Sequence, residues 1–207
     1  MTVSPTLRPT APPARPRLRG PARLRFDVDM FVRFCAAELP PDARVELIDG
    51  VIYEMPPTSP EHNGPTIDLN RLLVQRLGDR ARVLPGSSIL LGRWSMPMPD
   101  FAVLVRHDDP TEYHKRHAEP ADCLLIIEVA RSSLRFDRGR KASAYAGAGI
   151  PEYWIVAVGE GVIEVQREPR ADGKGYASVV RYGRGEAVTP AGFQDVRIGV
   201  DEVLGPG

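Results

Sequence analysis

The sequence predicts an α/β fold with a central mixed β-sheet flanked by helices and with additional antiparallel strands. Apolar residues recur at helical spacing in two segments, 26–38 and 59–79. Short runs rich in β-branched and aromatic residues surround them, and residues 122–130 are almost continuously apolar, as in a strand buried on both faces. A chain of 207 residues can bury a substantial core, and we expect one domain over residues 26–207.

Residues 1–25 differ in composition from everything that follows. They hold six arginines, six prolines and no acidic residue, whereas the remaining residues carry 21 basic and 27 acidic groups. A segment with so few large apolar side chains cannot offset the entropy of ordering, so we expect it to be disordered. Its arginines can contact phosphates nonspecifically and in a salt-sensitive way. The alternative is a solvated leader without a role.

The first two elements of the body are a helix and a hairpin. In residues 26–38 the apolar positions follow helical spacing after Asp27, a candidate N-cap. Residues 44–55 contain two short alternating runs around Asp49 and Gly50. Asp-Gly suits a type I′ turn, so this segment is predicted to be a β-hairpin.

A second helix is predicted over residues 59–79. Ser59 and Pro60 fit the N-cap and N1 positions. Gly64 and Pro65 indicate that the firm part of this helix begins later.

Strands dominate the second half of the chain. Residues 106–120 are expected to form a polar loop whose histidines are solvated, and 137–149 a helix that ends in small residues before Pro151. The last acidic pair, Asp201 and Glu202, opens a final helical turn. Predicted strands cover residues 82–92, 99–106, 122–130, 152–158, 161–168 and 176–182.

Two carboxylates in this strand block are candidates for chemistry. Pro99 is tolerated at the first position of a strand, so Asp100 lies at the strand's mouth. Glu128 comes near the end of the apolar run and is expected at a sheet edge or bend. Carboxylates from neighbouring strands can converge on Mg²⁺, and a bound metal activates water and stabilises charge on phosphate. Two solvated strand ends would give the same pattern.

A lysine near Glu128 would complete a nuclease-like site, but position 130 is Ala130. The nearest lysine is Lys141, in the first two turns of the following helix, where it can hold the attacking water or neutralise phosphate. The alternative is an exposed i,i+4 pair with Asp137, worth about 0.2–0.5 kcal/mol.

Three segments, ELIDG (46–50), Pro99-Asp100 and IEVARSSLRFDRGRKASAYAGAGIPEYWIV (127–156), resemble the Uma-type putative restriction endonuclease family. This bacterial family is part of the PD-(D/E)XK nuclease superfamily, and the resemblance spans roughly residues 26–204. It implies a restriction-endonuclease-like fold and a Mg²⁺-dependent phosphodiesterase site, with the lysine supplied from the helix.

The resemblance also implies roles for individual residues. Asp100 and Glu128 correspond to the metal ligands, and Lys141 to the partner of water or phosphate. Glu46 matches an accessory acid. His62 matches a histidine that can donate to phosphate or carry a proton, and its alternative is a residue that hydrogen-bonds locally at a helix start.

Two residues depart from the family pattern. Arg131 stands where an acid or a serine is frequent, and it adds positive charge beside Glu128. Gly139 lies inside the helix that carries Lys141, where glycine costs about 1 kcal/mol relative to alanine. It leaves the direction of the lysine side chain open.

The leading functional hypothesis is therefore an endonuclease that hydrolyses DNA with Mg²⁺, or Mn²⁺ as its substitute, through a metal-activated water. Double-strand cleavage implies a homodimer. The alternative is a non-catalytic nucleic-acid-binding or interaction module that retains the nuclease fold. A glycoside hydrolase using Asp100 and Glu128 leaves Lys141 without a role. Without a signal peptide or membrane span, a cytoplasmic location is expected.

Overall fold

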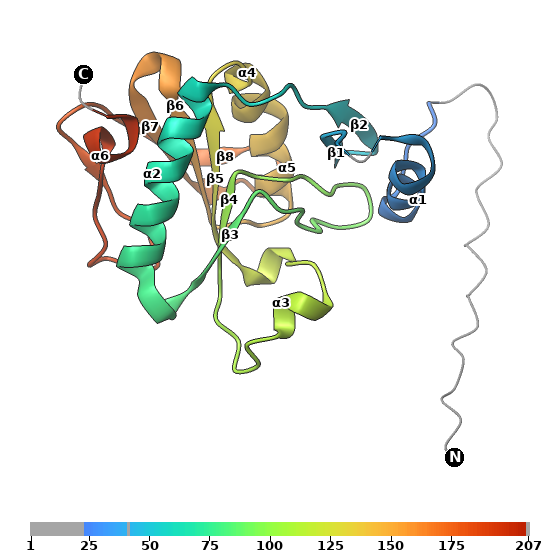
Figure 1. The fold of residues 1–207 in the computed structure, drawn as a ribbon, viewed down its shortest axis with the longest axis horizontal. Helices are drawn as coiled ribbons and strands as arrows, with labels where there is room; N and C mark the ends of the chain where they lie inside the picture. Colours follow the sequence, from blue (N-terminus) through green and yellow to red (C-terminus); the bar gives the residue numbers. More distant parts are fainter. Residues whose placement is uncertain (1–22, 41, 206–207) are drawn as a thin grey trace.

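A computed structural model describes residues 23–40 and 42–205 (Figure 1). Most of the segment that we expect to be disordered, 1–25, lies outside these residues. At its described end, the Arg25 Nε–H donates to the carbonyl of Asp49.

The helices are α1 Val28–Glu38, α2 Pro60–Leu77, α3 Glu112–Lys115, α4 Leu134–Phe136, α5 Ala142–Gly147 and α6 Val200–Leu204, with short helical turns η1 Gly78–Arg80, η2 Pro120–Asp122, η3 Asp137–Lys141 and η4 Val158–Glu160. The strands are β1 Val45–Ile48, β2 Val51–Glu54, β3 Arg82–Pro85, β4 Phe101–Leu104, β5 Cys123–Ala130, β6 Glu152–Ala157, β7 Val162–Pro169, β8 Tyr176–Tyr182, β9 Ala187–Val188 and β10 Ile198–Gly199.

A mixed six-stranded sheet lies at the centre, in the order β3-β4-β5-β6-β7-β8. Only β5 and β6 pair in parallel, and the other neighbours in this sheet are antiparallel. A parallel pair needs a crossover, which the helical segment α4-η3-α5 supplies. The β1–β2 and β9–β10 hairpins form separate small sheets. The predicted α/β fold with a mixed central sheet and additional antiparallel strands is confirmed.

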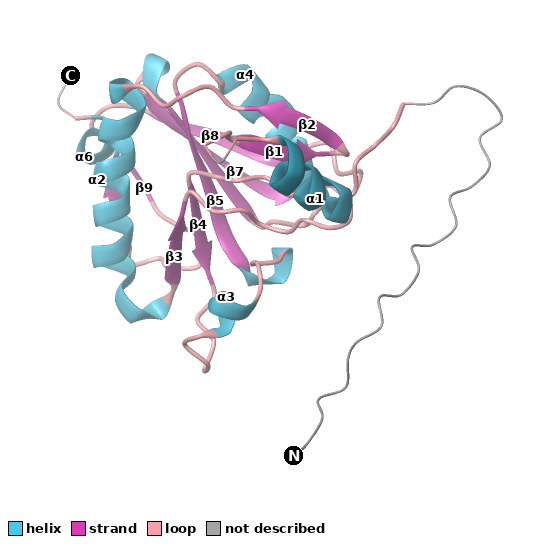
Figure 2. Cartoon of the chain, turned by 45° about the vertical axis from the view of Figure 1, so that its right-hand side comes forward, coloured by secondary structure: helices cyan, strands magenta, loops and turns pink. Residues whose placement is uncertain are grey.

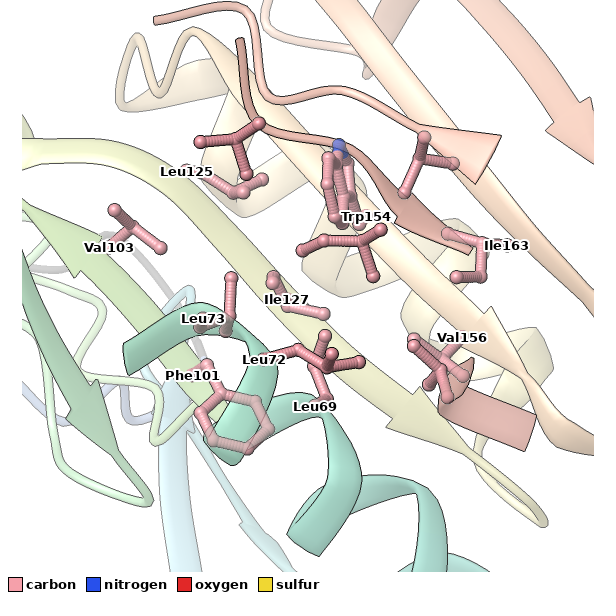
Figure 3. Packing of buried hydrophobic residues seen from close by; sticks show 14 of the residues in the cluster. Leu69, Leu72, Leu73, Phe101, Val103, Leu125, Ile127, Trp154, Val156 and Ile163 are labelled. Atoms are coloured by element: carbon pink, nitrogen blue, oxygen red, sulfur yellow. The ribbon is translucent and has the colours of Figure 1, made fainter. Parts of the chain in front are cut away.

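Helices cover both faces of the sheet, because alternate residues of each strand point to opposite sides. On one face, Leu69, Leu72 and Leu73 of α2 pack in one cluster with Leu125, Ile127 and Val129 of β5 (Figure 3). On the other face, Ala142, Tyr145 and Ala146 of α5 pack in a second cluster with Ile126 and Ala130 of β5. Figure 2 shows α2 on one side of the sheet and the β1–β2 hairpin with α1 on the other. Glu128 lies on the face that α5 covers.

The predicted hairpin and first helix are confirmed in detail. Asp49 and Gly50 have φ values of 52° and 76°, which a type I′ turn requires. Asp27 caps α1, because its Oδ1 accepts a hydrogen bond of 2.9 Å from the Met30 N–H.

The late start predicted for the second helix is wrong, because α2 is helical from Pro60 onward. Pro65 lies inside this helix and has no N–H to donate to the Glu61 carbonyl. Glu61 is exposed, so a water molecule can donate to that carbonyl instead. The strand predicted over 82–92 is also too long. β3 ends at Pro85, and a loop follows.

The loop 106–120 contains one short helix, α3. The expectation that the histidines of this loop are solvated does not hold for His107, because its Nε2 lies 3.0 Å from Oδ1 of the buried Asp122. The expected terminal helical turn is α6. In the described part of the chain, no helix is long and apolar enough to cross a membrane.

Candidate active site

The five predicted site residues come from five different parts of the chain and meet at one cavity of about 310 Å³. The cavity lies between the β1–β2 hairpin, the start of α2, the ends of β4 and β5 that face it, and η3. All five predicted residues are among those that line it: Glu46, His62, Asp100, Glu128 and Lys141. The structure therefore brings the whole set together, while their chemical roles stay predictions.

Asp100 directly precedes β4, as the sequence indicates. Phe101 pairs with Ile127 in the antiparallel ladder, so Asp100 comes beside Glu128 on the neighbouring strand. The Val129 N–H donates to Asp100 Oδ2 at 2.7 Å, and His62 Nε2 lies 3.1 Å from Oδ1. The carboxylate is thus fixed from both sides.

Glu128 does not lie at a sheet edge, contrary to expectation. It belongs to β5, an interior strand between β4 and β6, and only 4% of it is exposed. A single acidic residue in an apolar run does not reveal which strands flank it. Its Oε1 accepts hydrogen bonds from Lys141 Nζ at 2.9 Å and from the Tyr145 hydroxyl at 2.7 Å.

Lys141 is buried, with 2% exposure, and joins two acids. Its Nζ lies 2.9 Å from Glu128 Oε1 and 3.1 Å from Glu46 Oε1. The exposed pair with Asp137 is therefore excluded, because Asp137 is buried as well. The segment 137–141 is a π-helical turn in which the Ala142 N–H donates to the Asp137 carbonyl. Such turns rotate side chains away from their usual helical positions.

Glu46 and His62 complete the cavity wall. Glu46, in β1, is 2% exposed, and its Oε2 has no hydrogen-bond partner. His62, in the first turns of α2, contacts Asp100 through Nε2, and its Nδ1 lies 3.4 Å from the Thr66 hydroxyl. The local helix-start contact and the contact with the site therefore occur together.

Sequence reasoning missed two residues of this cluster. Asp137 lines the cavity and accepts a 2.6 Å hydrogen bond from Ser133, while its Oδ1 has no partner. Tyr145 contacts Glu128. The sequence signal was the spacing of Asp137, Lys141 and Tyr145, each four residues apart, which in a regular α-helix gives one shared face but does not tell whether that face is buried.

Burial and charge shift the protonation of this cluster. Burial raises the pKa of Glu128 well above its usual value, and it raises the pKa of Glu46 as well. Burial alone would lower the pKa of Lys141, but the charges of Glu128, Glu46 and Asp137 outweigh it and the pKa ends above normal. Lys141 is therefore an ammonium ion at neutral pH. The hydrogen bond to Asp100 raises the pKa of His62.

The donor set fits Mg²⁺. This ion takes oxygen ligands, usually one or two carboxylates together with waters and substrate phosphate. Asp100 and Glu128 supply carboxylates from neighbouring strands, and Glu128 Oε2 accepts no hydrogen bond from the described residues. Within that part of the chain, no group of three or more His, Cys, Asp and Glu side chains is arranged to hold a metal ion by itself.

Comparison with known proteins agrees with this fold. The profile of a family described as "Uma2: Putative restriction endonuclease" matches residues 28–201. A search of the curated proteins finds no match.

The solved structures that match this chain include the following two. A putative nuclease of DUF820 from Anabaena variabilis has a TM-score of 0.67 at 16% identity, covering 86% of this chain and 97% of its own. At that identity the likeness concerns the fold. The type IIG restriction endonuclease BpuSI has a TM-score of 0.39 at 15% identity, covering 69% of this chain and 15% of its own.

Proposed function

Because the chain belongs to the Uma2 family of putative restriction endonucleases, we propose that it is a Mg²⁺-dependent endonuclease that hydrolyses DNA phosphodiester bonds. One observation carries the proposal. Asp100 and Glu128, on neighbouring strands, share a cavity with Lys141, whose Nζ lies 2.9 Å from Glu128 Oε1. Two carboxylates that can hold a metal ion and an ammonium group that can offset charge on phosphate are suited to metal-assisted phosphoryl chemistry.

Asp100 and Glu128 hold the cation in this proposal. When bound, Mg²⁺ lowers the pKa of a water molecule and offsets charge on phosphate. Lys141 remains protonated and stabilises negative charge that develops on the phosphate. Because Lys141 has no free electron pair, it does not take a proton from the water. Glu46 Oε2, buried and without a partner, is the acceptor that we assign to that proton.

The rim of the cavity supports an anionic substrate. Arg44 and Arg131 are among the lining residues, and both can contact phosphate oxygens. The Arg-rich tail would add a nonspecific, salt-sensitive contribution to binding. Cleavage of both strands of a duplex needs two cavities, which a symmetric homodimer would provide.

The test is nicking of supercoiled plasmid with Mg²⁺ or Mn²⁺, with EDTA controls, comparing wild type, Asp100→Ala and Lys141→Ala. We expect wild type to nick DNA, and we expect the nicking rate of both variants to be lower by about 10²-fold or more. Equal nicking by all three proteins would assign the activity to a contaminant. DNA binding without nicking by wild type would favour a non-catalytic module instead.

A further inference from the structure

The Tyr145 hydroxyl and Lys141 Nζ donate to the same oxygen of Glu128. Tyr145 donates to Oε1 at 2.7 Å, and Lys141 donates to it at 2.9 Å. Tyr145 is fully buried, in the first turns of α5 directly after the turn that carries Lys141. Two residues of one helical segment therefore fix the same carboxylate oxygen.

The two oxygens of Glu128 consequently differ. Oε1 has two lone-pair directions, and two donors occupy them. Oε2 accepts no hydrogen bond from the described residues, and Glu128 lines the cavity. The carboxylate thus offers one free oxygen to a cation, in a fixed orientation.

A row of packed tyrosine rings holds the Tyr145 hydroxyl in place. The Tyr145 ring lies 5.0 Å from that of Tyr153, which in turn lies 6.1 Å from that of Tyr176. The Tyr176 hydroxyl donates to the Ile150 carbonyl at 3.1 Å, and the Tyr153 hydroxyl donates to the Asp137 carbonyl at 3.3 Å. Each ring is anchored at its polar end, so Tyr145 cannot swing away from Glu128 without displacing the others.

We propose that Tyr145 is a positioning residue that fixes Glu128 for cation binding, with Oε1 held by Tyr145 and Lys141 and Oε2 left for the metal. This inference rests on the proposed function, since it assumes that Glu128 is a metal ligand. Partners that orient a metal ligand typically change metal affinity or activity by 10–100-fold when they are removed.

The experiment measures Mn²⁺ binding in the absence of DNA, from the loss of the free-ion electron paramagnetic resonance signal. Tyr145→Phe removes the hydroxyl and keeps the ring, and we expect it to weaken Mn²⁺ binding by about 10-fold or more. Tyr176→Phe is the matched control, because it removes a buried hydroxyl from the same row of tyrosine rings, and this hydroxyl donates to the Ile150 carbonyl and not to Glu128. We expect Tyr176→Phe to bind Mn²⁺ as wild type does.

Each other outcome is decisive. Equal Mn²⁺ affinity of wild type and Tyr145→Phe would overturn the positioning role and leave the proposed function standing. No Mn²⁺ binding by wild type would overturn the metal site itself, and the positioning role with it. A crystal structure of wild type with Mn²⁺ needs no variant to fold. It would support the proposal with the ion on Oε2 and Tyr145 on Oε1, and overturn it with the ion on Oε1.

Discussion

Lys141 Nζ lies 2.9 Å from Glu128 Oε1, although thirteen residues separate them in the chain. The position two residues after Glu128 holds Ala130, which points to the same face of the sheet as Glu128 does. Ala130 is buried with 1% exposure, so this small side chain leaves the space in which the helical segment approaches the strand. The helix then supplies the ammonium group that the strand lacks.

Lys141→Met tests how strongly this ion cluster stabilises the fold. The substitution leaves Glu46 and Glu128 buried without their cation, and breaking a buried pair in this way costs about 3–5 kcal/mol. We expect the free energy of unfolding, measured with urea at pH 8, to fall by about that amount. At pH 5 the loss should be smaller, because both acids have raised pKa values and take up protons.

Lys141→Arg is the control, since it keeps the charge and we expect it to destabilise less than Lys141→Met. If Lys141→Met loses the same stability at pH 5 and pH 8, Glu46 and Glu128 are not left charged in that variant.

The sequence predicted the elements well where periodicity or turn chemistry decides them. The Asp49-Gly50 turn, the Asp27 cap and the apolar run of β5 are local signals, and each is confirmed. The interior position of Glu128 was missed, because strand order depends on pairing between distant segments. The burial of Asp137 and Lys141 was missed as well, since their spacing also fits an exposed pair and the π-helical turn has no clear sequence signal.

Leu73→Ala tests the packing of α2 on the sheet. Leu73 is fully buried in the cluster that includes Ile127 and Trp154 (Figure 3). Removing its side chain leaves a cavity, and we expect the free energy of unfolding to fall by about 2–5 kcal/mol. The adjacent Val74, 51% exposed, gives the matched control. Val74→Ala should change the stability by no more than about 0.5 kcal/mol, and equal effects of the two variants would contradict this packing.

Asp137→Asn tests a buried carboxyl whose protonation is linked to folding. Burial raises the pKa of Asp137 from 3.8 to about 6. The folded state therefore holds this proton more tightly, and the stabilisation is fully present below about pH 4 and lost as the pH rises through about 6. Asparagine is neutral at both pH values. The free energy of unfolding of the variant, relative to that of wild type, should therefore rise by on the order of 3 kcal/mol between pH 4 and pH 8.

Urea unfolding of wild type and Asp137→Asn at those two pH values measures this change. Asp68→Asn, at a side chain that is 45% exposed, reports the effect of the same substitution away from the cavity. If the difference in unfolding free energy between wild type and Asp137→Asn is constant with pH, the raised pKa of Asp137 is refuted.

His62 offers two roles that a pair of substitutions separates. Its Nε2 lies 3.1 Å from Asp100 Oδ1, so it can fix the carboxylate by a hydrogen bond, or it can carry a proton during the reaction. Glutamine keeps an N–H donor but does not titrate, whereas alanine removes both. Because Val129 already holds the other oxygen of Asp100, the geometry favours positioning.

We therefore expect plasmid nicking to fall by about 10–100-fold in His62→Ala and to be largely retained in His62→Gln. An equal loss in both variants would instead identify His62 as the proton carrier, since only histidine can bind and release a proton there near neutral pH.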